Sequence, residues 1–271
     1  MSGASRKTWL DHWLLRAAIP IAIGAVAMGC WELLVHVKEI PEYILPAPSV
    51  IGKTLVAEWD SLSAVWLVTL QTMFASLGLA VVGGVLLAML FSVSRLLEIS
   101  LFPHAVVLQV TPLIAIAPLI MVWLGDYPFL VLLLCAFIVS FFPILSNTVV
   151  GLKSADHNLG DLMRLYRASP WQRLRFLLVP TALPYFLAGL KIAANLALVG
   201  AVVGEFVVGP GGDKTGLAST ILESSFRLDI AKMFAALALI SATGIAAYLA
   251  THALSQLLLG AWHESAVRRD A

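Results

Sequence analysis

Three kinds of residue in this chain could do chemistry: two lysine-threonine pairs, scattered histidines and cysteines, and two charges inside apolar segments. Gly52-Lys53-Thr54 resembles the end of a phosphate-binding loop, but such a loop needs a glycine five residues earlier, where Ala47 stands. Asp213-Lys214-Thr215 fails in the same way. We therefore expect no nucleotide site in this chain and no enzymatic activity of its own.

The histidines do not form a constellation with acidic or hydroxyl residues near one membrane interface, which argues against a membrane enzyme. They are His12, His36, His104, His157, His252 and His263. Cys30 and Cys135 lie far apart in separate apolar runs, so neither a disulfide nor a metal site is predicted.

Lys191 and Glu205 lie within or at the edge of one apolar segment. Charges inside a membrane are costly and usually face a cavity or a partner. Lys191 could line a transport pathway or anchor the helix that carries it. Glu205 could help to close an outer gate, contact an external protein, or form an interfacial salt bridge.

Weaker candidates for a pathway are Thr111, which precedes Pro112, and Phe141, for which ordinary packing is the alternative. Small residues in the apolar segments favour close helix packing instead. They are Gly78, Gly83, Gly84, Gly200 and Gly204.

The elements that must position these residues are membrane-spanning helices. Of the 271 residues, 60% are hydrophobic and 12% are charged, about half the share of charge in a soluble domain. This composition excludes a soluble globular protein, a disordered chain and a nucleic-acid binder. Six apolar stretches are long enough to span a bilayer: 17–37, 66–93, 101–124, 129–150, 184–208 and 233–259. Pro112 and Pro118 predict a kink or local unwinding in the third.

The basic residues predict the orientation. With the N-terminus inside, eleven of the seventeen lysines and arginines lie in cytoplasmic segments and five in outer segments. We therefore expect a cytoplasmic segment 1–16, a transmembrane domain 17–259 and a cytoplasmic tail 260–271. Residues 38–65 and 209–232 are then outer segments, and 151–181 form the longest inner loop.

That inner loop is the most charged part of the chain, and it contains an amphipathic pattern. Its apolar positions recur at helical spacing: Leu159, Leu162, Met163 and Tyr166. Asp156 is a plausible N-cap, and residues 168–170 (Ala-Ser-Pro) are expected to end the helix. The pattern fits either a lipid-surface helix with arginines at the interface or a docking helix for a cytoplasmic protein.

The same loop resembles the coupling-helix signature of ABC-importer permeases, which reads Glu-Ala-Ala, three residues, Gly, nine residues, Ile-x-Leu-Pro. The matching positions are Asp161-Leu162-Met163, Arg167 and Leu177-Leu178-Val179-Pro180. Asp161 replaces the glutamate, Met163 replaces an alanine and Arg167 replaces the glycine. Because arginine disfavours the positive φ that glycine allows, we expect the helix to continue unbroken through Arg167.

The flanking residues are similar to the nitrate/sulfonate/taurine group of permeases, which includes permeases for thiamine precursors and riboflavin. They are Leu45-Pro46-Ala47-Pro48-Ser49, residues 141–148, residues 189–192 and residues 200–206.

The resemblance implies an all-α integral membrane protein with a type I ABC importer permease fold and a short cytoplasmic coupling helix. The implied partners are a second permease copy, two cytoplasmic ABC ATPases that bind ATP and magnesium, an extracytoplasmic substrate-binding protein and membrane lipid. No cofactor in this chain and no nucleic-acid partner are expected. The implied location is a bacterial inner membrane, crossed several times, with both termini cytoplasmic.

The residues expected to meet the ATPase are Asp161, Leu162, Met163, Arg164, Tyr166, Arg167 and Ala168. Met163 and Tyr166 would be buried in that contact, and Arg164 and Arg167 would form its charged rim.

The resulting hypothesis is a permease subunit that couples ATPase motion to alternating access during import. The alternative is a secondary-active transporter working without an ATPase, which would need buried coupling charges or a repeat between its halves. The substrate stays open between a sulfonate, taurine or nitrate-type solute and a vitamin-precursor heterocycle, with a slight preference for the heterocycle.

Overall fold

The computed structural model describes residues 13–210 and 215–260, and every regular element within them is a helix. Helices satisfy their own backbone hydrogen bonds, as lipid requires of a spanning segment. The elements are α1 (Trp13–Val37), α2 (Pro48–Ala57), α3 (Trp59–Val93), α4 (Arg95–Val110), α5 (Leu113–Leu124), α6 (Pro128–Lys153), α7 (His157–Leu165), α8 (Pro170–Arg173), the π-helical turn η2 (Leu174–Leu178), α9 (Val179–Val208), α10 (Leu217–Phe226) and α11 (Ile230–Leu259).

Five of these helices are long and apolar enough to cross a bilayer, and the bent pair α4–α5 adds a sixth crossing if taken as one span. The two helices of that pair meet at an angle of 100°. Thr111 is extended there because the residue before a proline disfavours the helical conformation. The predicted interruption of the third span is thus confirmed.

Several helices extend beyond the predicted spans. The second crossing begins at Trp59 instead of residue 66, and the fifth belongs to a continuous helix that begins at Pro170 instead of residue 184. Both outer segments, predicted only as long loops, also contain helices, α2 and α10. Helices α2 and α8 each begin with a proline. Proline suits the first helical position because its ring fixes a helical φ, and the backbone N–H that it lacks would have no partner within the helix there.

The centre of the bundle is the pair α6 and α9, which pack so closely that glycine is required. A Cβ on Gly200 would lie 2.5 Å from the Cα of Ala136, and one on Gly204 would lie 3.2 Å from the Cα of Leu132. The prediction of close packing is confirmed at these glycines. It is wrong for Gly78, where a Cβ would meet nothing within 4 Å.

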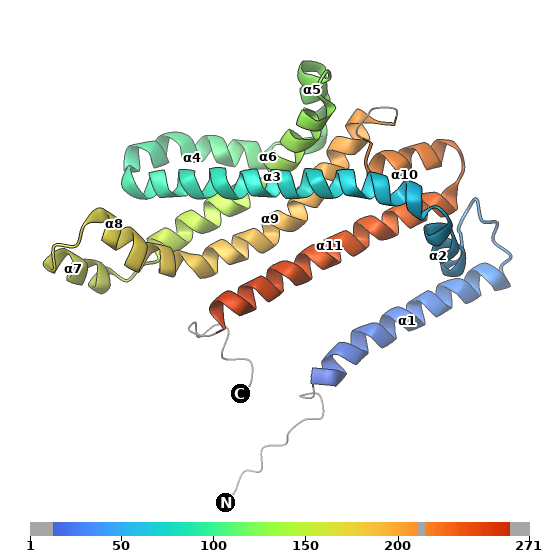
Figure 1. Cartoon of the computed structure of the whole chain (residues 1–271), viewed down its shortest axis with the longest axis horizontal. Coiled ribbons are helices and arrows are strands. Elements are labelled where there is room, and N and C mark those ends of the chain that lie inside the picture. The colour runs from blue at the N-terminus through green and yellow to red at the C-terminus, as the bar shows by residue number, and fades with distance from the viewer. Residues whose placement is uncertain (1–12, 211–214, 261–271) are drawn as a thin grey trace, which may run out of the picture.

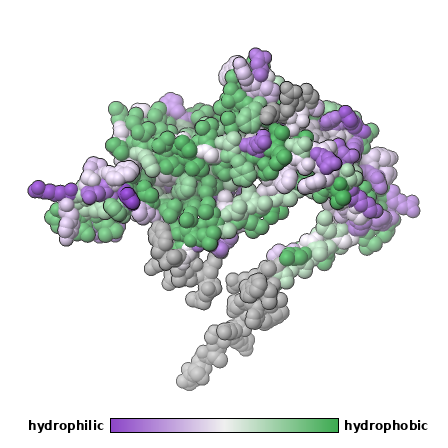
Figure 2. Space-filling view, in the orientation of Figure 1, coloured by the Kyte–Doolittle hydropathy of each residue, from purple (hydrophilic) through white to green (hydrophobic). Residues whose placement is uncertain are grey.

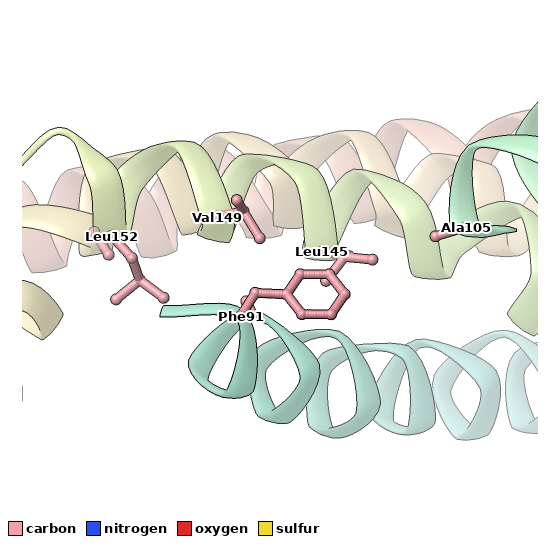
Figure 3. Close-up of a cluster of buried hydrophobic side chains, with 7 residues drawn as sticks. Phe91, Ala105, Leu145, Val149 and Leu152 are labelled. Atoms are coloured by element: carbon pink, nitrogen blue, oxygen red, sulfur yellow. The ribbon is translucent and has the colours of Figure 1, made fainter. Parts of the chain in front are cut away.

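A cluster of buried apolar side chains joins four helices at one end of the bundle (Figure 3). Phe91 of α3, Ala105 of α4 and Ala182 of α9 meet three α6 residues there. Those three are Leu145, Val149 and Leu152. This cluster packs α3, α4, α6 and α9 into one unit.

Figure 1 shows α7 and α8 at one end of the bundle and α2 and α10 at the other. Helix α1 runs toward the end with α2 and α10, and α11 runs away from it. Apolar surface covers most of the helices between the two ends, and hydrophilic residues concentrate at the ends (Figure 2). This distribution is that of a multi-pass membrane protein.

The C-terminal half of helix α1 is anchored to α2 and α11. Glu32 accepts hydrogen bonds from the amide (3.0 Å) and hydroxyl (2.7 Å) of Ser49 in α2. The rings of Trp31 and Phe234 lie 5.8 Å apart. Of the residues in the most apolar part of α1, 6% are buried. The corresponding share is 44% in α6 and 44% in the α8–α9 helix.

The start of α3 is tied to α11 by an ion pair, in which the Lys232 ammonium donates to Glu58 at 2.9 Å. This hydrogen bond is the main reason why the pKa of Glu58 lies below its ordinary value.

Candidate functional site

The amphipathic segment of the inner loop folds as predicted into a short helix, α7. Asp156 caps it, with its carboxylate accepting from the Asn158 amide at 2.7 Å. Within α7, Gly160 is the buried residue, so the helix stands away from the bundle. A charged cavity of about 390 Å³ lies between α7 and the inner ends of α3 and α6.

The helix ends at Leu165, not after Arg167, and the expectation that arginine would let it continue is wrong. Arg167 adopts a φ of +50°, the left-handed conformation. The Arg167 amide donates to the carbonyl of Arg164, and the Ala168 amide donates to the carbonyl of Met163, both at 2.9 Å. This is a Schellman motif, and it places arginine where glycine is usual.

The predicted apolar face of α7 is exposed. Leu162 is 48% exposed and Tyr166 is 78% exposed, while Met163 is half-buried. Arg164 pairs with Asp161 at 3.3 Å on the solvent side. The predicted coupling residues are thus together on one short helix and its C-terminal turn.

Sequence reasoning missed the second half of this surface. A groove of about 380 Å³ is lined by Leu162, Met163, Tyr166, Ala168, Gln172 and Phe176. Phe176 and its neighbour Trp171 are more than 60% exposed. The signal that could have found them is the capping box of Ser169 and Gln172, which starts a new helix immediately after α7.

The new helix makes the coupling surface continuous with a membrane span. Helices α8 and α9 and the turn η2 form one helix of 39 residues, Pro170–Val208. Only the connection 166–169 separates α7 from it. A short connection thus joins the exposed face of α7 to a helix long enough to cross the membrane.

The end of α6 is also tied to α4, because Lys153 forms an ion pair with Glu98. Glu98 lies in the first turn of α4, where the helix dipole favours a negative charge.

The four pathway or gate candidates lie in separate surroundings. Lys191 contacts α11: its ammonium lies 3.2 Å from Nδ1 of His252 and 5.5 Å from the centre of the Tyr248 ring. Thr111 donates to the carbonyl of Val107 at the α4–α5 break. Phe141 has its ring centre 5.1 Å from that of Phe137, and it packs against the buried cluster that joins α3, α4, α6 and α9.

Glu205, the fourth candidate, is fully buried. Its carboxylate accepts hydrogen bonds from the Thr69 hydroxyl (2.7 Å) and the Ala218 amide (2.8 Å). Because the Glu205 side chain has no exposed surface, it cannot touch a soluble protein in this conformation. This disfavours direct contact with an external protein, one of the three roles predicted for Glu205. Both of these partners are neutral, and among the described residues Glu205 forms no salt bridge.

A bundle of spanning helices with an exposed coupling helix at one end defines a membrane transport subunit. Residues 80–260 match the family described as the binding-protein-dependent transport system inner membrane component, and the chain belongs to this family.

Named relatives agree with this assignment. A probable ABC transporter permease of Haemophilus influenzae is 31% identical, over 86% of this chain and 94% of the relative. The riboflavin transport permease of Chloroflexus aurantiacus is 34% identical, over 84% of each chain. The formylaminopyrimidine transport permease of Halalkalibacterium halodurans is 32% identical, over 90% of this chain and 96% of the relative.

Among solved structures, a chain of the inward-facing methionine ABC transporter MetNI matches with a TM-score of 0.60 and 18% identity. The match covers 73% of this chain and 95% of that chain, and it shows a shared type I ABC importer permease fold.

The chain is therefore the transmembrane permease subunit of an ATP-driven, binding-protein-dependent importer in an inner membrane. The alternative of a secondary-active transporter working without an ATPase is not supported.

Proposed function

We propose that two copies of this chain form the membrane part of the importer and that each α7 docks on one cytoplasmic ATPase. The observation that carries this proposal is the exposed apolar face of α7, joined by four residues to a helix that spans the membrane. Movement of the ATPases would then tilt α9 and alternate the access of the pathway. A short, stiff helix suits this task because it transmits a displacement instead of absorbing it.

ATP and magnesium would bind to the ATPase subunits, and hydrolysis would take place there. The sequence supports this division of labour, because neither lysine-threonine pair has the glycine that a phosphate loop requires.

We further propose that α7 and both chain termini face the cytoplasm. The excess of basic residues in the N-terminal, inner-loop and C-terminal segments supports this orientation. The opposite end, with α2 and α10, would then face the substrate-binding protein.

The substrate we propose is a vitamin-type heterocycle, in preference to a sulfonate or nitrate. Relatives named for riboflavin and for formylaminopyrimidine support it, since they are 34% and 32% identical to this chain, against 26% for a relative named for aliphatic sulfonates. Ligand identification on the companion binding protein tests this choice directly.

The docking proposal is tested by Tyr166→Ala. Tyr166 is the most exposed aromatic residue of the α7 surface, and a buried aromatic anchor contributes ~2 kcal/mol to a protein interface. We expect the affinity of the ATPase for the permease to fall by about 30-fold. Substrate uptake should fall with it, while the permease still inserts and assembles.

The matched control is Tyr43→Ala, which removes another exposed tyrosine, from the segment between α1 and α2. It should leave ATPase binding unchanged. Unaltered binding and coupled uptake in Tyr166→Ala would refute the docking role of α7.

A further inference from the structure

Glu205 is the one charged side chain that is fully buried among the described residues, and it joins three helices. It lies near the outer end of α9. One carboxylate oxygen accepts from the hydroxyl of Thr69 in α3, and the other accepts from the amide of Ala218 in α10. Both partners are neutral groups, a hydroxyl and a backbone amide.

The first turn of α10 is bound by further contacts of the same junction. The Thr69 hydroxyl also accepts from the Leu217 amide at 3.0 Å, and the Ser219 hydroxyl donates to the backbone carbonyl of Glu205 at 3.0 Å. Three successive residues of α10 are therefore hydrogen-bonded to α3 or α9. The partly positive N-terminus of α10 adds a favourable interaction with the carboxylate.

Gly216 makes this approach possible. A Cβ at Gly216 would lie 2.1 Å from the carboxyl carbon of Glu205, far inside van der Waals contact. The carboxylate occupies the space of the missing side chain, so the junction requires glycine at this position.

The energetic consequence is that α10 cannot move away from α9 alone. Separation would leave the amides of Leu217 and Ala218 and the hydroxyl of Ser219 without their partners, and the Glu205 carboxylate would lose one of its two hydrogen bonds; unsatisfied buried groups are costly. Helices α9 and α10 must therefore move together.

The far end of α10 is exposed. Phe226 is 77% exposed, and the adjacent Arg227 side chain is 74% exposed. An aromatic ring beside an arginine suits a protein contact. Transport by this family depends on a binding protein, and α10 lies at the end of the bundle opposite α7 (Figure 1).

We propose that Glu205, Thr69 and Gly216 are positioning residues that lock α10 onto α9, so that a substrate-binding protein docked on α10 moves the helix leading to α7. The 39 residues of that helix span about 58 Å at 1.5 Å per residue, enough to connect the two faces of the membrane. This inference rests on the proposed coupling role of α7, and it extends the gate hypothesis for Glu205 by naming its partners and its direction of action.

The test uses the complete transporter in lipid nanodiscs, with its ATPase and its loaded binding protein. Thr69→Val keeps the shape of the side chain and removes the hydroxyl. Thr251→Val is the matched control, because the Thr251 hydroxyl bonds only to carbonyls of its own helix, α11. Two quantities are measured: amide hydrogen exchange in residues 215–226, and stimulation of ATP hydrolysis by the binding protein.

We expect exchange in the first turn of α10 to rise roughly tenfold in Thr69→Val, as the loss of one buried hydrogen bond implies. Stimulation by the binding protein should fall severalfold, and neither quantity should change in Thr251→Val. Glu205→Gln, which keeps the side-chain shape and removes the charge, is measured in parallel in case Thr69→Val does not assemble.

Unchanged exchange in both variants would show that the junction does not hold α10. Faster exchange with undiminished stimulation would show that α10 does not transmit the signal. The exchange measurement does not involve α7, so it separates failure of this inference from failure of the docking proposal.

Discussion

Arg167 carries the least expected conformation at the scale of single residues. Its φ of +50° costs an L-amino acid roughly 1 kcal/mol relative to glycine. The strain is sustained because the two amides after α7 need the carbonyls that a Schellman turn offers. The chain must also reverse before Ser169, which caps the next helix.

This strain predicts that Arg167→Gly will not destabilise the permease and will raise its unfolding free energy by up to about 1 kcal/mol. Arg164→Gly is the matched control, because it removes the same side chain from within α7 and should destabilise the helix by up to about 1 kcal/mol. Hydrogen exchange of α7 amides would report both effects. Equal destabilisation by the two substitutions would contradict the assignment of Arg167 to a strained cap.

At the scale of elements, the pair α6 and α9 sets the geometry of the bundle. Close contact is possible because glycine lets the two backbones approach. Gly200 is the tightest point, where the missing Cβ would face both the backbone and the side chains of α6.

Gly200→Ala is therefore expected to lower the free energy of unfolding by about 1–3 kcal/mol, the range found for overpacked cores. Gly78→Ala is the control, since its Cβ would enter open space in the middle of α3 and alanine favours helix. Thermal unfolding of the purified permease compares the two variants. A Gly200→Ala protein as stable as the Gly78→Ala protein would mean that α6 can shift without cost.

At the scale of the whole molecule, α1 is the spanning helix that a single copy covers least. It is anchored to α2 by Glu32, and its apolar residues are largely exposed along its length. In the proposed homodimer, the second copy would cover part of this face.

Removal of residues 1–37 is then expected to convert the dimer into a monomer while the bundle of α3 to α11 stays folded. Native mass spectrometry measures the number of copies, and circular dichroism checks the helical content. A stable dimer without α1 would assign the dimer contact to other helices.

The sequence alone determined the class of fold, most spans and the position of the coupling helix. These follow from local properties: long apolar runs need lipid, proline interrupts a span at Thr111–Pro112, and the spacing of apolar residues with an Asp156 cap defines α7. The glycine pair 200 and 204 also predicted close packing, because small residues act wherever two helices meet.

The tertiary structure alone decided the rest. The sequence marked Glu205 as unusual, but its partners Thr69 and Ala218 lie on other helices and carry no distinguishing pattern. The left-handed turn at Arg167 contradicts local preference and exists because the next capped helix requires the reversal. The Glu205 junction depends on contacts between segments far apart in the chain, which form only when the helices pack, whereas the Arg167 turn depends on where the next helix begins.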